Sequence, residues 1–145
     1  MKRCLIVLFV WLITNPALSD GDIDGSITLI KRQDSAAMQV TAVTLKQGGG
    51  TITAEGQMGE YGRVYLTYEL TADPGRSGGT VIGEGRGFLR DGSFAYGSGT
   101  GAFSREGTVF TMHILFRIND GTQNFDRVVF DAFTGKLSHD TFVLK

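Results

Sequence analysis

From about residue 26 onward, hydrophobic and polar positions alternate along short segments, and turn-forming residues separate one segment from the next. The segments are rich in Val, Ile, Thr, Phe and Tyr, and this composition and period favour β-strands. No stretch as long as an ordinary helix keeps a helical period through the glycines. We therefore predict strands at residues 26–30, 38–45, 51–55, 63–70, 80–89, 93–97, 109–118, 125–133 and 137–144.

These short strands, mostly linked by hairpins, define an all-β fold class. They suit a small antiparallel β-barrel of about eight strands, of calycin-like type, or a β-sandwich. Glycine accounts for 21 of the 145 residues, about twice its usual share. The alternating glycines of residues 83–87 and 97–101 have no Gly-Lys-Ser/Thr after them, so we expect them to bend barrel strands and not to bind phosphate.

Two turns can be specified from their residue types. Asp91-Gly92 is a dipeptide favoured in two-residue type I′ hairpins, and such a loop sets Leu89 opposite Phe94 and Gly87 opposite Tyr96. Pro74-Gly75 fits a type II turn within a longer loop.

The hairpin at Asn119-Asp120-Gly121 allows two registers. A two-residue loop puts Ile114 opposite Arg127, whereas a three-residue loop with Gly121 in the left-handed conformation puts Phe110 opposite Phe130 and Met112 opposite Val128. We favour the three-residue loop because it keeps apolar partners on one face.

This register divides the side chains of the hairpin between two faces. One face is apolar, with Phe110, Met112, Ile114, Phe116, Val128, Phe130 and Ala132, and the other mixes His113, Arg117, Arg127 and Asp131 with Leu115, Val129 and Phe133. The mixed face is either the solvated outer wall of the barrel or the lining of a polar-tipped cavity. In the second case the apolar face packs against another subunit.

The first residues differ from the rest of the chain. Lys2 and Arg3 precede an apolar run at residues 4–13, and small residues stand at Ala17 and Ser19. This pattern predicts a signal peptide over residues 1–19 and one β-barrel domain over residues 20–145, in a secreted or periplasmic protein. The apolar run is too short for a membrane anchor, so we expect no membrane span after signal removal.

Charge and residue usage exclude several kinds of function. Removing residues 1–19 takes Lys2 and Arg3 from the 14 basic residues and nothing from the 15 acids, which leaves 126 residues with a formal charge of −3 and no cysteine. We therefore expect no nucleic-acid partner and no cofactor.

Residues 20–27 match the start of an EF-hand calcium loop, but Lys31 occupies the position of its bidentate Glu, and His113 and His139 lack a second histidine at ligand spacing. We therefore expect no metal site.

The segment Tyr96-Gly97-Ser98-Gly99-Thr100-Gly101-Ala102-Phe103, with Arg105-Glu106-Gly107 and a long apolar strand after it, resembles the Gly-Gly-Thr-Gly-x-Phe turn of dirigent and allene-oxide-cyclase-like proteins. The resemblance covers about residues 50–145, and Ser98 stands where the family has its first glycine. It implies an eight-stranded barrel with an apolar interior for a small hydrophobic substrate, in homodimers or homotrimers. Some bacterial relatives are natural-product cyclases. The motif marks a turn and transfers no catalytic residue.

We therefore expect a secreted barrel that binds a small apolar molecule in its interior. The alternatives are a cyclase or isomerase acting on a small hydrophobic substrate, and a structural or protein-binding barrel without a ligand. The catalytic residues are unknown. The candidate ligand-binding residues are His113, Arg117, Arg127 and Asp131. There Arg127 would hold a carboxylate or enolate oxygen, Asp131 would orient Arg127, and His113 would transfer a proton near neutral pH.

Overall fold

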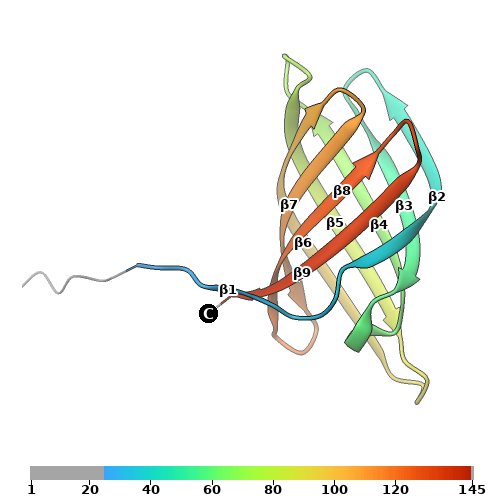
Figure 1. Cartoon of the computed structure of the whole chain (residues 1–145), viewed down its shortest axis with the longest axis vertical. Coiled ribbons are helices and arrows are strands. Elements are labelled where there is room, and N and C mark those ends of the chain that lie inside the picture. Colours follow the sequence, from blue (N-terminus) through green and yellow to red (C-terminus); the bar gives the residue numbers. More distant parts are fainter. Residues whose placement is uncertain (1–24, 145) are drawn as a thin grey trace, which may run out of the picture.

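The computed structural model describes residues 25–144, which form nine β-strands and one short 3-10 helix (Figure 1). The elements are β1 (Leu29–Lys31), β2 (Ala36–Lys46), β3 (Gly49–Gln57), η1 (Gly59–Tyr61), β4 (Arg63–Ala72), β5 (Gly78–Phe88), β6 (Phe94–Glu106), β7 (Val109–Ile118), β8 (Gln123–Asp131) and β9 (Lys136–Leu144). In this range no helix is long and apolar enough to cross a bilayer. The signal peptide predicted at residues 1–19 and the carboxylates of Asp20, Asp22 and Asp24 lie outside the described residues.

Strands β2 to β9 form a closed antiparallel barrel of eight strands, which confirms the predicted fold class. Each strand pairs with the next along the chain, and β9 pairs with β2 to close the sheet. The short β1 lies on β9, where Leu29 is opposite Leu144 and Lys31 is opposite Phe142. Most strands were predictable because they alternate and are bounded by turn residues, whereas β6 has 13 residues and extends well beyond the predicted 93–97.

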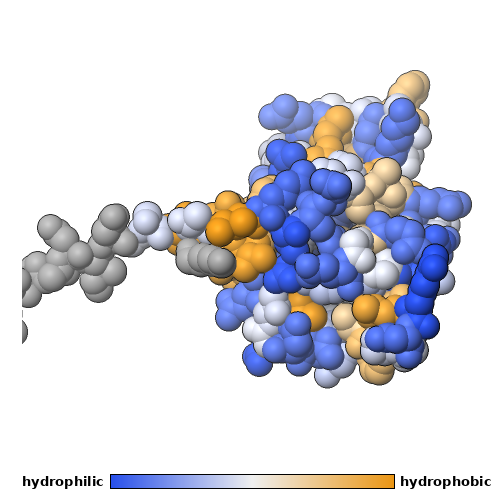
Figure 2. Space-filling view, turned by 60° about the horizontal axis from the view of Figure 1, so that its bottom comes forward, coloured by the Kyte–Doolittle hydropathy of each residue, from blue (hydrophilic) through white to orange (hydrophobic). Residues whose placement is uncertain are grey.

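The up-and-down topology gives the barrel two ends, which we call end A and end B. End A carries η1, the turns at residues 89–93 and 119–122, and β1, and it lies at the bottom of Figure 1. End B carries the turns at residues 47–48, 73–77, 107–108 and 132–135, at the top of the figure. Figure 2 brings the bottom of this view forward and shows hydrophilic side chains interspersed with apolar ones around end A.

The apolar face of β7 and β8 points into the barrel. Met112 and Ile114 have no exposed surface, and Phe116 is 3% exposed. The three-residue loop is confirmed, since Phe110 pairs with Phe130 and Met112 with Val128, and Gly121 has a φ of 89°. Ala132 lies just beyond β8, in the turn, and is exposed. The interior is completed by Ala36, Met38, Ile52, Ala54, Met58, Val64, Leu66, Tyr68, Leu70, Val81, Phe103 and Leu137.

The register predicted for the β5–β6 hairpin is wrong by one residue. Phe88, not Leu89, lies opposite Phe94, and Tyr96 lies opposite Arg86 and not Gly87. A type I′ loop needs positive φ at both central residues, whereas here only Gly92 has it, at 85°. The side chain of Asp91 accepts a hydrogen bond from the Ser93 amide at 2.9 Å and so stabilises a loop that is one residue longer.

Two other sequence interpretations need correction. The glycine motif of residues 97–103 lies inside β6 and is not a turn. In the 73–77 loop the Arg76 amide donates to the Asp73 carbonyl at 2.8 Å, which makes the turn. Gly75 has no positive φ and Arg76 has one of 58°, so this is not the type II turn predicted for Pro74-Gly75.

The inner face of β5 and β6 consists largely of glycine. Gly83 lies opposite Gly99, and Gly85 lies opposite Gly97. A Cβ atom at Gly83 would lie 2.4 Å from Cζ of Phe116, so the missing side chains make room for large residues from the facing wall. The outer face of the same region bears an exposed row of aromatic rings, in which Phe88, Phe94 and Tyr96 are stacked and Tyr65 of β4 meets Phe88 edge to face.

Candidate functional site

A group of polar side chains is buried inside the barrel near end A. Asn124 and Asp126 of β8 are 1% and 5% exposed, and His139 and Thr141 of β9 are 2% and 1% exposed. All four stand at positions that alternate with apolar core residues, so the period of the strand directs them inward. Buried polar groups are costly unless they are hydrogen-bonded, so the partners of these groups decide what the site can do.

Three of the buried side chains form a hydrogen-bonded chain across the interior. The Tyr68 hydroxyl lies 2.9 Å from His139 Nδ1, and His139 Nε2 lies 2.8 Å from Asp126 Oδ2. Burial raises the pKa of Tyr68 well above its usual value of 10, with a further contribution from the Asp126 carboxylate. Tyr68 therefore keeps its proton. A neutral imidazole with its proton on Nε2 satisfies both bonds, because Tyr68 then donates to Nδ1 and Nε2 donates to Asp126.

One oxygen of this chain is left without a partner. Asp126 Oδ1 is buried and makes no hydrogen bond with any described residue. Asp126 and His139 line a partly open cavity of about 40 Å³ at end A, together with Met58, Tyr61, Val64, Leu66, Gly85, Arg86, Gly87, Ala95, Tyr96, Gly97, Phe116, Ile118 and Asn124. A cavity of this size holds about two or three water molecules. Asp126 lines this space, and its unpartnered oxygen is an acceptor for which the described residues supply no donor.

A second polar chain supplies a donor at the same cavity. Asn124 Nδ2 donates to the Tyr61 hydroxyl at 2.8 Å, and Asn124 Oδ1 accepts from Arg32 Nε at 3.1 Å. Arg32 also pairs with Glu60 at 3.0 Å and lies over the Tyr61 ring, 5.9 Å from its centroid. Since Tyr61 accepts the bond from Asn124, its own proton is free to donate into the cavity. Burial raises the pKa of Tyr61, so the hydroxyl stays protonated at neutral pH.

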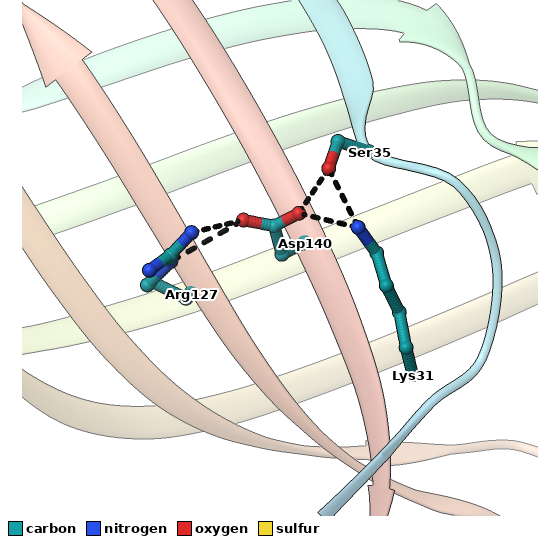
Figure 3. A network of polar contacts seen from close by, with 4 residues as sticks. All are labelled: Lys31, Ser35, Arg127 and Asp140. Carbon is teal, nitrogen blue, oxygen red and sulfur yellow. Dashed lines mark hydrogen bonds and ion pairs between the residues drawn. The ribbon is translucent and has the colours of Figure 1, made fainter.

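A different network holds the outer surface of β9 to β1 and β8 (Figure 3). Arg127 Nη2 and Nε contact Asp140 Oδ2 at 2.8 and 3.2 Å, and Ser35 Oγ donates to Asp140 Oδ1. Lys31 Nζ donates to Ser35 at 2.9 Å and lies 3.4 Å from Asp140. The Ser35 hydrogen bond, with help from Arg127, lowers the pKa of Asp140. The segment between β1 and β2 covers this carboxylate, which is only 7% exposed.

The structure places the four sequence-predicted ligand residues on the outer wall. His113, Arg117 and Arg127 are exposed and Asp131 is half-buried. The face that they share is therefore the solvated outer wall of the barrel and not the lining of a cavity. The apolar face of Phe110, Met112, Ile114 and Phe116 accordingly faces the interior and not a second subunit.

Three of the four residues, His113, Arg127 and Asp131, also have separate partners. His113 lies opposite Arg127, as the register predicted, and stacks on Phe125 with ring centroids 5.7 Å apart. Arg127 pairs with Asp140, and Asp131 accepts bonds within its own turn from the Phe133 amide and the Thr134 hydroxyl. Ligand binding by these four residues stays a prediction.

The interior residues were missed although the sequence contained a signal for them. Asn124 and Asp126 share the period-two face of Val128 and Phe130, and His139 shares the face of Leu137. A polar residue at a position that alternation assigns to the core is the informative exception. Within residues 25–144 no group of three or more His, Asp or Glu side chains is placed to hold a metal ion.

Comparison with known proteins adds no assignment: no family model, curated protein or solved structure matches the chain.

Proposed function

We propose that the barrel binds a small, mostly apolar molecule at end A and holds the polar group of that molecule between Asp126 and Tyr61. The observation that carries the proposal is the buried Asp126 Oδ1, which has no partner among the described residues and belongs to a side chain that lines a cavity formed mainly by apolar residues and glycine. A few directed polar groups in an apolar lining are the usual composition of a small-molecule site.

Two groups that line the cavity specify the polar part of the ligand; the buried Thr141 hydroxyl also has no partner among the described residues but does not line the cavity. Asp126 Oδ1 needs a donor and the Tyr61 hydroxyl needs an acceptor. An alcohol satisfies both, because its hydroxyl donates one hydrogen bond through its O–H group and accepts another at its oxygen. An ether satisfies only Tyr61, and a carboxylate would bring a second negative charge against Asp126.

The size of the cavity limits the apolar part. About 40 Å³ is far below the roughly 300 Å³ of a site for a drug-sized ligand. The ligand is therefore compact, with its hydroxyl in the cavity and its body between Tyr61, Tyr96 and Ile118 at end A. This agrees with the resemblance to allene-oxide-cyclase-like barrels, which bind small hydrophobic molecules.

The test uses cyclohexanol and tetrahydropyran, two six-membered rings that differ in having a donor. In amide NMR spectra of the isotope-labelled protein, cyclohexanol is expected to shift the signals of Asn124, Asp126 and His139. Tetrahydropyran is expected to bind at least tenfold more weakly. Equal affinity for the two compounds, or shifts confined to other residues, would contradict the proposal.

A matched pair of variants tests the location. Ala95 lines the cavity and Ala102, on the same strand, points outward and is exposed. Ala95→Leu fills the space and is expected to abolish cyclohexanol binding, whereas Ala102→Leu leaves it unchanged. Loss in both variants, or in neither, would place binding elsewhere.

A second candidate function is proton transfer, the chemistry of a cyclase or isomerase. His139 fixes one oxygen of Asp126 and leaves the other free, which is the arrangement of a general base. Asp126 would take a proton from the carbon beside a carbonyl, and Tyr61 would donate a hydrogen bond to the enolate oxygen. Return of a proton from solvent restores the ketone.

Deuterium incorporation into cyclohexanone in heavy water measures this step directly. The protein is expected to accelerate exchange over buffer, and Asp126→Asn, checked for an intact amide spectrum and for cyclohexanone binding, is expected to lose the acceleration. If the wild-type protein exchanges deuterium into cyclohexanone no faster than buffer does, proton transfer is contradicted and ligand binding remains the proposed function. The secreted or periplasmic location and the homodimer or homotrimer stay predictions from the sequence.

A further inference from the structure

End B has its own hollow, at the opposite end of the barrel from the cavity of Asp126. It measures about 200 Å³ and is lined by Leu45, Lys46, Gln47, Gly49, Leu70, Ala72, Arg76, Phe103, Arg105 and Phe110. Its floor is the last layer of the core, where Leu70 and Phe103 are 5% and 6% exposed and the Phe103 and Phe110 rings lie 6.0 Å apart. An apolar floor of this kind accepts a short hydrocarbon chain.

The rim of the hollow is cationic. Lys46, Arg76 and Arg105 are exposed, and among the described residues none of them forms an ion pair. Asp73 belongs to a neighbouring turn and Glu106 ends β6, but no carboxylate of residues 25–144 lines the hollow itself. Three positive charges around an apolar floor, in a chain with a formal net charge of −1, create a local field that favours an anion.

The Arg105 guanidinium is held in place by backbone carbonyls and not by acids. Arg105 Nε donates to the Arg76 carbonyl at 3.3 Å, and Arg105 Nη1 donates to the Gly107 carbonyl at 2.9 Å. A guanidinium has five N–H donors, so most of those of Arg105 remain free for a ligand. Arg76 has a φ of 58° and is the only described residue other than glycine with a positive φ. Such strained positions often occur at ligand-binding sites.

From these features we propose that end B binds a free amphiphile with a carboxylate head, with the head on Lys46, Arg76 and Arg105 and the hydrocarbon chain on Leu70, Phe103 and Phe110. The site is independent of the one proposed at end A. The two sites differ in the ligand group they accept, because end A presents a carboxylate to a hydrogen-bond donor and end B presents cations to an anion.

Octanoate, 1-octanol and acetate separate the contributions of head and chain. Octanoate is expected to bind at least tenfold more tightly than either of the others and to shift the NMR signals of Leu70, Phe103 and Phe110. Equal binding of 1-octanol would show that the cations play no part. Equal binding of acetate would show an anion site without a chain-binding floor. Either result would overturn the proposal, as would octanoate shifts confined to Asp126 and His139.

Variants test the cationic rim. Lys46→Gln removes a charge that makes no ion pair with any described residue, and Arg76→Gly relieves the positive φ, so the double variant is expected to fold. It should bind octanoate at least tenfold more weakly, whereas the control Arg90→Gln, in an exposed turn at end A, should bind it as the wild type does. Unchanged affinity in the double variant would contradict the proposal. Octanoate that binds only when presented in anionic phospholipid vesicles would overturn it as well and assign this surface to a membrane.

Discussion

The two ends of the barrel treat polar side chains in opposite ways. At end A, Tyr68, His139 and Asp126 are buried and depend on one another for hydrogen bonds. At end B, Lys46 and Arg105 keep their charges in water, around an apolar floor. A buried polar group that loses its partner cannot replace the missing hydrogen bond with one to water. A solvated charge can, so its loss of a partner costs little stability. Stability should therefore be sensitive to substitution at end A and tolerant at end B.

The strongest test of this difference uses the two histidines. His139→Ala leaves the Tyr68 hydroxyl and Asp126 Oδ2 buried without a partner, so we expect the free energy of unfolding to fall by about 3–5 kcal/mol. The matched control is His113→Ala on the outer wall, expected to change it by about 0.5 kcal/mol or less. Urea denaturation measures both. Similar losses in the two variants would remove the contrast between interior and surface.

A smaller effect is expected for Tyr68→Phe. The variant keeps the ring but leaves His139 Nδ1 without its donor, at a cost of about 1–2 kcal/mol near neutral pH. Because burial raises the pKa of Tyr68 in the folded state, its stabilising contribution is complete below the ordinary tyrosine pKa of about 10 and is lost as pH rises toward the folded value. The difference between wild type and Tyr68→Phe should therefore shrink above about pH 10. A constant difference up to the pH of unfolding would contradict burial as the cause.

The Asp140 network gives the opposite pH dependence. The pKa of Asp140 is lowered in the folded state, so its contribution is present above the ordinary aspartate pKa of about 3.9 and is lost as pH falls through the folded value. Asp140→Asn should cost about 1 kcal/mol at pH 7 and progressively less in acid. Thermal melts between about pH 7 and about pH 2.5 would measure this, since the window spans the ordinary aspartate pKa. An Asn variant with an unchanged acid profile would show that Ser35 and Arg127 do not stabilise the charge.

The smallest effect is expected at end B. Arg105→Gln loses two hydrogen bonds to exposed carbonyls, which should lower the free energy of unfolding by at most about 0.5–1 kcal/mol. The urea midpoint measures it. A loss as large as that of His139→Ala would show that the rim of end B is structural and would weaken the contrast between the ends.

The sequence predicted the strands because alternation is a local property. Arg63–Ala72 alternates exposed Tyr65 with buried Leu66, and this is visible without any partner strand. Register is less local. The Asn119-Asp120-Gly121 loop was predicted correctly because apolar pairing separated its two alternatives, but Asp91-Gly92 was not, because its outcome depends on an Asp91 side-chain bond.

The sequence left open whether the candidate residues lie on the inner or the outer wall, for a physical reason. The sequence shows which residues share a strand face, but whether that face turns inward depends on closure of the whole barrel. His113 and Arg127 are on one face as predicted, and that face is outside. The Tyr68–His139–Asp126 chain joins β4, β8 and β9, and β4 is remote from the others both in sequence and in strand order. No spacing rule connects such residues.

The way in which the barrel closes also determines which pair of neighbouring strands separates first during local opening. β9 meets β2 over only the residues from Ala36 to Gln39, whereas β5 and β6 pair along their full length from Gly78 to Phe88. Beyond Gln39 the rest of β2 is paired with β3 alone, across a bulge between Val40 and Ala42. Local opening takes place where the fewest hydrogen bonds must break, so backbone amides along this seam should exchange with deuterated solvent sooner than those of β5 and β6. Solvent and small solutes can then reach the packed interior through transient separation of β2 from β9, without a permanent pore.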